Sequence, residues 1–438
     1  MKRLLKLALL FVMMLCLCGC DFLTFSVEGL LSSPIIADEQ TAIYQALIAR
    51  TGKEVFFEYP RSGSYRSAFV MTDVDQEAGE EALVFYSLSS SQDEDVRLSI
   101  LDRDENGDWI SMFEIQGVGN TVDKVLINRV GNNTDIIVGY GTRGYEGSQV
   151  IIYRYYMGAL AVIYEGNYSV LELYDLDGCG EEEIIIVSKT GAQSSATVIQ
   201  SADGISYFTH EAALSSNAVS IEGHAIGQLE TGESVLYVDV LDESGYISTE
   251  LIYLRDDTLI CPTSSIAGLR EYTARPLGYL SVDYDGDSDV EVPVTEPFIG
   301  YASGSRGTVQ LMTKWYSYDA DQLCYVKKSN AYYNITDGYV FTLPNRWLNV
   351  VTASRSEDGI VTFLKYDSSA ETMDDMKPIM SFTSLSAYAD SSSLIDDGYT
   401  ELVSTDFKRY FVKILADESE PLVLTNDEIK DNFYGIDR

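Results

Sequence analysis

The sequence predicts a mostly β protein, in which a β-propeller of about five four-stranded blades is followed by a small α+β domain. The first observation is a turn-and-strand motif that recurs about every fifty residues, a usual length for a propeller blade. The second is composition, because 31 tyrosines and alternating patterns of Val, Ile and Thr favour strands. A pair of stacked sheets is the alternative, but it would not explain the constant order of the motif.

Residues 1–19 are predicted to be a lipoprotein signal peptide. Basic residues precede an apolar run, Leu7–Leu17, that is too short to span a bilayer. The run ends in Leu-Cys-Gly-Cys, which resembles the bacterial lipobox. This resemblance implies diacylation of Cys20 and cleavage before it, so that residues 20–37 become a membrane tether. An ordinary secretory signal is the alternative.

Residues 38–53 are predicted to form a short helix. Asp38 can cap its first turn, and Gly52 can end it. Its small apolar stripe is expected to pack on the propeller, and binding of a partner is the alternative.

The predicted propeller spans residues 54–333. Three copies of its motif have Asp-x-Asp, a turn of small and acidic residues, and a Glu eight residues after the first Asp, directly before an apolar strand. The copies begin at Asp73, Asp175 and Asp283, and their glutamates are Glu81, Glu183 and Glu291. Two degenerate copies begin at Ile127 and Ile226. In the first unit, four strands are expected in residues 65–72, 81–86, 96–101 and 109–115, with an Asn106-Gly107 hairpin turn before the last.

This pattern resembles the FG-GAP/VCBS-type repeats of integrin-α-like propellers, over about 280 residues. The resemblance implies a propeller fold. It implies little about function, because such propellers serve adhesion, binding and, in some cases, polysaccharide cleavage.

The acidic turns are candidate Ca²⁺ sites with a structural role. Alternating acids direct carboxylates into one concavity, and Ca²⁺ takes six to eight oxygen ligands. The best candidates are in the third turn, followed by the first and then the second, where Cys179 stands at an expected oxygen ligand. In that order the ligands are Asp283, Asp285, Asp287, Asp289 and Glu291; Asp73, Asp75, Glu77 and Glu81; and Asp175, Asp177 and Glu183. The alternative is that these acids cap turn amides without a metal.

After residue 333 the period disappears, and residues 334–438 are predicted to form a separate α+β domain on the propeller rim. Several strands are expected there, followed by a closing helix. Thr425 and Glu428 have the spacing of a capping box for that helix.

The net charge of −38 disfavours binding to nucleic acid, and it favours divalent cations or cationic partners. Beyond the predicted lipidated cysteine, three cysteines remain at wide spacing, which is not a disulfide framework. Cys261 and Cys324 could pair, although free buried thiols are favoured.

The sequence has no recognised catalytic motif. His210 and His224 are the two histidines, and neither lies near a nucleophile motif. We therefore expect a non-catalytic, monomeric binding or scaffold module, anchored by lipid to the extracytoplasmic side of a bacterial cell membrane. Its ligand would be an envelope glycan, peptide or protein. The alternatives are a propeller-type polysaccharide lyase or glycoside hydrolase acting on surface glycans, and a structural partner in an envelope assembly.

Overall fold

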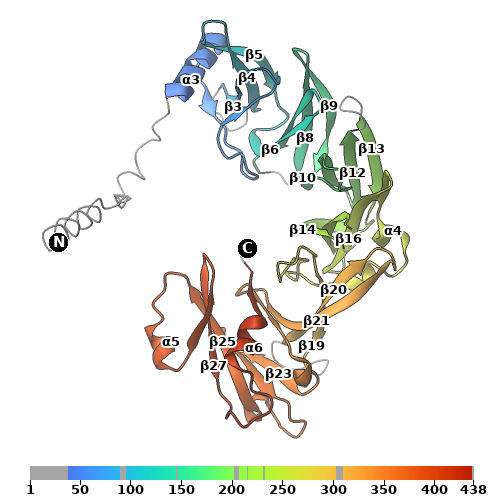
Figure 1. The fold of residues 1–438 in the computed structure, drawn as a ribbon, viewed down its shortest axis with the longest axis vertical. Helices are drawn as coiled ribbons and strands as arrows, with labels where there is room; N and C mark the ends of the chain where they lie inside the picture. Colours follow the sequence, from blue (N-terminus) through green and yellow to red (C-terminus); the bar gives the residue numbers. More distant parts are fainter. Residues whose placement is uncertain are drawn as a thin grey trace, which may run out of the picture.

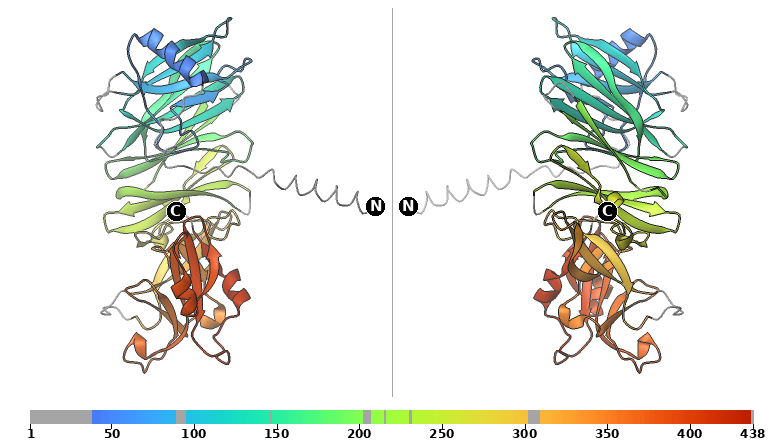
Figure 2. Two further views of the ribbon diagram at one scale, coloured as in Figure 1. Left: turned by 90° about the vertical axis from the view of Figure 1, so that its left-hand side faces the viewer. Right: turned by 90° about the vertical axis from the view of Figure 1, so that its right-hand side faces the viewer.

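The computed structural model describes residues 38–88, 95–144, 147–201, 207–214, 216–229, 232–301 and 309–436. The predicted signal peptide, Cys20 and the tether lie outside these residues. Within the described chain, the strands form six antiparallel sheets that follow one another along an open arc (Figure 1). The side views in Figure 2 show the sheets stacked one on the next along the long axis. The protein is therefore mostly β, in an arrangement consistent with a propeller-like fold.

The first three sheets follow the predicted repeat. Sheet 1 contains β1 (Phe56–Phe57), β2 (Phe69–Thr72), β3 (Glu81–Ser87), β4 (Arg97–Arg103) and β5 (Trp109–Gln116). Sheet 2 contains β6 (Thr121–Val130), β7 (Asn133–Gly141), β8 (Ser148–Tyr156) and β9 (Ala159–Tyr168). Sheet 3 contains β10 (Val170–Tyr174), β11 (Glu183–Thr190), β12 (Gln193–Ser201) and β13 (Tyr207–Ala213). The strands β2 to β5 match those expected for the first unit; the short β1 was not expected.

The remaining sheets are more irregular. Sheet 4 contains β14 (Ala218–Gln228), β15 (Ser234–Asp242), β16 (Tyr246–Arg255), β17 (Thr258–Ile260) and β18 (Arg275–Pro276). Sheet 5 contains β19 (Val292–Pro297), β20 (Leu311–Asp319), β21 (Cys324–Asn334), β22 (Tyr339–Thr342) and β28 (Phe433–Gly435). Sheet 6 contains β23 (Val351–Arg355), β24 (Val361–Lys365), β25 (Lys377–Ser386), β26 (Thr400–Ser404) and β27 (Lys408–Ile414).

Stacking of the sheets explains the continuous apolar strands. In β11, Ile184 and Ile186 pack in a cluster with sheet 2, whereas Ile185 and Val187 pack in a cluster with sheet 4. Alternate residues of a strand point to opposite faces, so a strand covered on both faces has no polar side. The acidic turn before it lies at the edge of the stack, where charge meets solvent.

Helix α3 (Asp38–Thr51) covers the outer side of sheet 1 (Figure 1). Ile43 and Leu47 are fully buried against Trp109 and the first sheet. The predicted apolar stripe therefore packs as expected. No helix in the described part of the chain is both long and apolar enough to cross a membrane.

The C-terminal residues continue the stack of sheets. The boundary that we expected between residues 333 and 334 falls inside β21, and β22 and β28 join sheet 5 on its far side. One aromatic core, which includes Phe341, Phe363 and Phe382, joins sheets 5 and 6. The α-helices after residue 333 are short, α5 (Ser392–Asp396) and α6 (Asn426–Asp431), and two 3-10 turns lie at Asn345–Trp347 and Met373–Asp375. The capping box of Thr425 and Glu428 is present at α6.

Candidate metal centres

The three acidic turns share one pattern of hydrogen bonds. The Glu at the start of the strand after each turn, or directly before it in the case of Glu291, is buried. Its Oε2 accepts the backbone N–H of the residue after the first Asp. The bonds are Val74 to Glu81 at 2.5 Å, Leu176 to Glu183 at 2.7 Å and Tyr284 to Glu291 at 3.3 Å. These carboxylates satisfy turn amides that the sheet leaves unpaired.

The first Asp of each turn also caps backbone amides. Asp73 accepts from Gln76, Asp175 from Gly180, and Asp283 from Gly286, at 2.7, 2.9 and 2.7 Å. The capping role, which we considered as the alternative to a metal, is therefore present in all three turns. A carboxylate oxygen has further lone pairs, so capping leaves coordination capacity.

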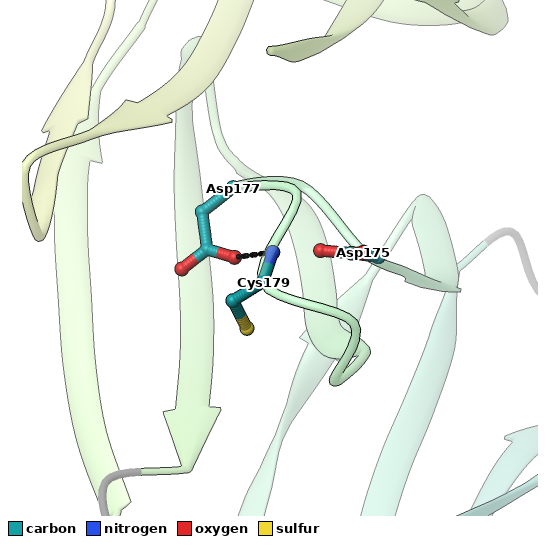
Figure 3. A group of neighbouring side chains, drawn as sticks. All are labelled: Asp175, Asp177 and Cys179. Carbon is teal, nitrogen blue, oxygen red and sulfur yellow. Dashed lines mark hydrogen bonds between the residues drawn. The ribbon is translucent and has the colours of Figure 1, made fainter. Parts of the chain in front are cut away.

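Three groups of ligand atoms come together. Carboxylate oxygens of Asp73, Asp75 and Glu81 lie within 4.8 Å of one another, as do those of Asp283, Asp285 and Glu291. The second turn gathers Asp175, Asp177 and Cys179. Figure 3 shows Asp177 bonded to the Cys179 amide, with the Asp175 carboxylate directed toward the same turn. The other predicted ligands, Glu77, Glu183, Asp287 and Asp289, are not in these groups.

A lysine enters the third turn from β21. Lys328 Nζ lies 2.8 Å from Asp287 Oδ2, 3.3 Å from Asp289 Oδ2 and 2.8 Å from Glu291 Oε1. Burial opposes the charge on Lys328, but hydrogen bonds to Asp287 and Glu291 outweigh it and raise the lysine pKa. Burial raises the pKa of Glu291 to about 7, against the effect of Lys328. The sequence contains no basic residue within this turn, so this neutralisation was not predicted.

In the second turn, the side chain that reaches the acids from another strand is a neutral amide. Gln200 Nε2 donates to Asp177 Oδ2 at 2.7 Å. A hydrogen bond with Asp177 raises the pKa of the exposed Cys179 thiol to about 11. A protonated thiol is a poor metal ligand, which weakens this turn as a metal site.

The first turn keeps its negative charge. In the described chain, no lysine or arginine forms an ion pair with Asp73, Asp75 or Glu81, and Arg129 donates only to the backbone oxygen of Asp73. Burial raises the pKa of Glu81, and the charges of Asp75 and Asp102 add to this effect. Unlike the third turn, this one therefore has no side-chain cation that neutralises it within the described residues.

The acidic turns lie in a row along one edge of the arc, alternating with the hairpin turns of sheets 2 and 4. Hydrogen bonds connect the neighbours in this row. They run from Gln76 Nε2 to the Gly131 oxygen, from Asn128 Nδ2 to the Glu182 oxygen, from the Ser234 amide to the Leu176 oxygen and from the Gln228 amide to the Ser288 oxygen. We call this row the acidic edge.

A cavity of about 640 Å³ adjoins the third turn. Its walls include the apolar Leu229 and Val326, the lysine Lys328, and four aspartates. The aspartates are Asp287, Asp289, Asp319 and Asp321. Neither histidine nor arginine lines this cavity.

A second polar cluster lies on the concave side of the arc, where β6, β10 and β14 are found (Figure 1). Glu172 Oε1 lies 2.7 Å from Lys124 Nζ and 2.9 Å from His224 Nε2. Burial opposes ionisation of Glu172, but hydrogen bonds from His224 and Lys124 outweigh it and lower its pKa. Sequence reasoning missed this cluster, because its members are about fifty residues apart on different sheets. The other histidine, His210, contacts Gln200 at 3.3 Å.

No protein-family model matches the chain, and no curated protein matches it. Among solved structures, the chain is similar to an exotype rhamnogalacturonan lyase, YesX. The sequence identity is 11%, the match covers 75% of each chain, and the TM-score is 0.29. A similarity this low carries no argument about the function of the chain.

Proposed function

We propose that this protein is a lipid-anchored module of the bacterial cell envelope, built as an open β-propeller with FG-GAP/VCBS-like repeats, that binds a ligand outside the cytoplasm without catalysis. The observation that supports binding is the acidic edge with its adjoining cavity. Four aspartates surround apolar walls there, and one lysine is the only cation among the lining residues. The lipobox-like Leu-Cys-Gly-Cys supports the anchor.

Among the expected ligands, a peptide or protein segment with basic residues fits this cavity best. The aliphatic stem of a lysine or arginine would contact Leu229 and Val326. Its charged head would meet Asp319 and Asp321, the two lining aspartates that Lys328 does not contact. Such an interaction weakens as salt rises, since exposed charges are screened over about 10 Å at 0.1 M salt.

Binding of basic and acidic model peptides to the full-length protein tests this proposal. The double substitution Asp319→Asn and Asp321→Asn should weaken binding of the basic peptide and reduce its dependence on salt. A matched control is Asp367→Asn with Asp390→Asn, which removes two exposed charges near sheet 6. Equal binding by both double variants would contradict the proposal.

We also propose that Ca²⁺ has a structural role, with the first turn as its principal site. Three carboxylate groups lie close enough to share an ion there, and no ion pair from the described residues neutralises them. The second turn is weaker because of its thiol. This order differs from the one expected from sequence, because Lys328 occupies the third turn.

Glycan cleavage, by a lyase or a hydrolase, is a second candidate function. The observation that favours it is the cluster of Glu172, His224 and Lys124 on the concave side, which places a carboxylate between an imidazole and an amine. Incubation with acidic and neutral polysaccharides, followed by an assay for new chain ends, tests this function. His224→Ala should abolish any activity found; activity that persists would exclude the cluster as its source.

A further inference from the structure

Lys328 lies at an irregular position in its strand. In the pairing of β20 with β21, Trp315 faces Ser329 and Tyr316 faces Lys327, so Lys328 has no partner in the ladder. It is the extra residue of a β-bulge. A bulge interrupts the regular strand locally and changes the direction in which a side chain points.

The bulge brings the Lys328 amine among the acids of the third turn. Its three contacts are Asp287, Asp289 and Glu291, all within 3.3 Å of Nζ. An ammonium group has three N–H donors, so three carboxylates can saturate it. Glu291 is also a member of the group of oxygens that resembles the metal-ligand group of the first turn.

We propose that Lys328 is a tethered counter-cation that closes the third acidic turn, so that this turn folds without a metal although its acids match those of a metal-binding turn. The amine is part of the same chain, so it is always available to neutralise the turn. A divalent ion would have to displace it from Glu291 before binding. This closure concerns the folding of the turn, although Lys328, Asp287 and Asp289 also line the cavity that we propose as the ligand site.

The contacts of Lys328 provide a selective test. Asp285 belongs to the oxygen group of the third turn, but it makes no ion pair with Lys328 within the described structure. Asp285→Asn therefore removes a metal ligand and leaves all three lysine contacts in place. Lys327→Met is the matched control for Lys328→Met, because it removes the same charge at the neighbouring exposed position.

The experiment counts Ca²⁺ ions bound to the purified full-length protein by isothermal titration calorimetry and records its melting temperature with Ca²⁺ and with EGTA. We expect Asp285→Asn to leave both quantities unchanged in the presence of Lys328. Lys328→Met should bind one more Ca²⁺ per chain than the wild type and show a larger rise in melting temperature with Ca²⁺. Adding Asp285→Asn to Lys328→Met should remove both gains, and Lys327→Met should behave as the wild type.

Two results would overturn the proposal. The first is a loss of one bound Ca²⁺ when Asp285→Asn is made in the otherwise wild-type protein, since the third turn would then hold a metal beside Lys328. The second is an unchanged number of bound ions in Lys328→Met. If Lys328→Met does not fold even with Ca²⁺, the comparison of Asp285→Asn with the wild type still shows whether the third turn holds a metal.

Discussion

A buried ion pair joins two strands of sheet 4, β15 and β18, at the point where the chain leaves for sheet 5. Asp239 in β15 and Arg275 in β18 are 1% and 0% exposed, and Asp239 Oδ1 lies 2.6 Å from Arg275 Nη2. Asp239 also accepts the Ser281 amide at 2.6 Å and the hydroxyls of Ser281 and Thr249, both at 2.9 Å. Arg275 donates further to the oxygens of Thr273 and Tyr279. One carboxylate therefore organises the connection between two sheets.

Asp239→Ala would leave the Arg275 guanidinium buried without its counter-charge. Removing one partner of a buried, hydrogen-bonded pair costs about 3–5 kcal/mol of unfolding free energy, because the remaining charge stays desolvated. The comparison is Glu401→Ala, which breaks the exposed pair with Arg409. Exposed pairs contribute about 0–1 kcal/mol. Urea unfolding followed by circular dichroism measures both values.

A double variant separates the pair from its neighbours. Asp239→Ala with Arg275→Met removes both charges, so it should recover a substantial part of the stability that Asp239→Ala loses. If Asp239→Ala changes the unfolding free energy by less than about 1 kcal/mol, the pair does not have the role that its burial indicates. A double variant as unstable as the single one would assign the loss to the hydroxyl and amide contacts instead.

Three further predictions concern the turns and the anchor. Burial raises the pKa of Glu183 from 4.5 to about 7, so without Ca²⁺ its contribution favours folding at low pH and is lost as pH rises from about 4.5 to about 7. Glu183→Gln should remove this pH-dependent loss of unfolding free energy, which is about 3 kcal/mol from the size of the pKa shift. Urea unfolding across this pH range measures the loss. A variant with the same pH dependence as the wild type would argue against this prediction. Asp75→Asn should remove most of any rise in melting temperature with Ca²⁺, which corresponds to about 3 kcal/mol at a hundredfold excess over the dissociation constant. If the melting temperature of the wild type is the same in Ca²⁺ and in EGTA, the proposed structural role of Ca²⁺ is refuted. Cys20→Ala should release the protein from membranes, and mass spectrometry should find lipid on Cys20 in the wild type; an unmodified N-terminus elsewhere would contradict the anchor.

The strands and turns of the repeat could be predicted because their causes are local. The run from Glu183 to Val187 reads as a strand from its own residues, and the Asp-x-Asp turn before it is held by amides within the same turn. The packing of α3 follows from its apolar stripe for the same reason. The motif ends near residue 333, so it gave no register for the later strands, which continue to β28 in sheets 5 and 6.

The order of the sheets along an open arc, and the charges that meet between strands, were decided only by the tertiary structure. Lys328 lies 37 residues from Glu291. A β-bulge directs Lys328 into the turn, and no local sequence pattern predicts that bulge. Lys124, Glu172 and His224 meet because three successive sheets place their first strands side by side. The sequence by itself determined where negative charge gathers, since the acids are neighbours along the chain. Which of those charges is neutralised depends on contacts between distant residues, and these exist only once the sheets have stacked.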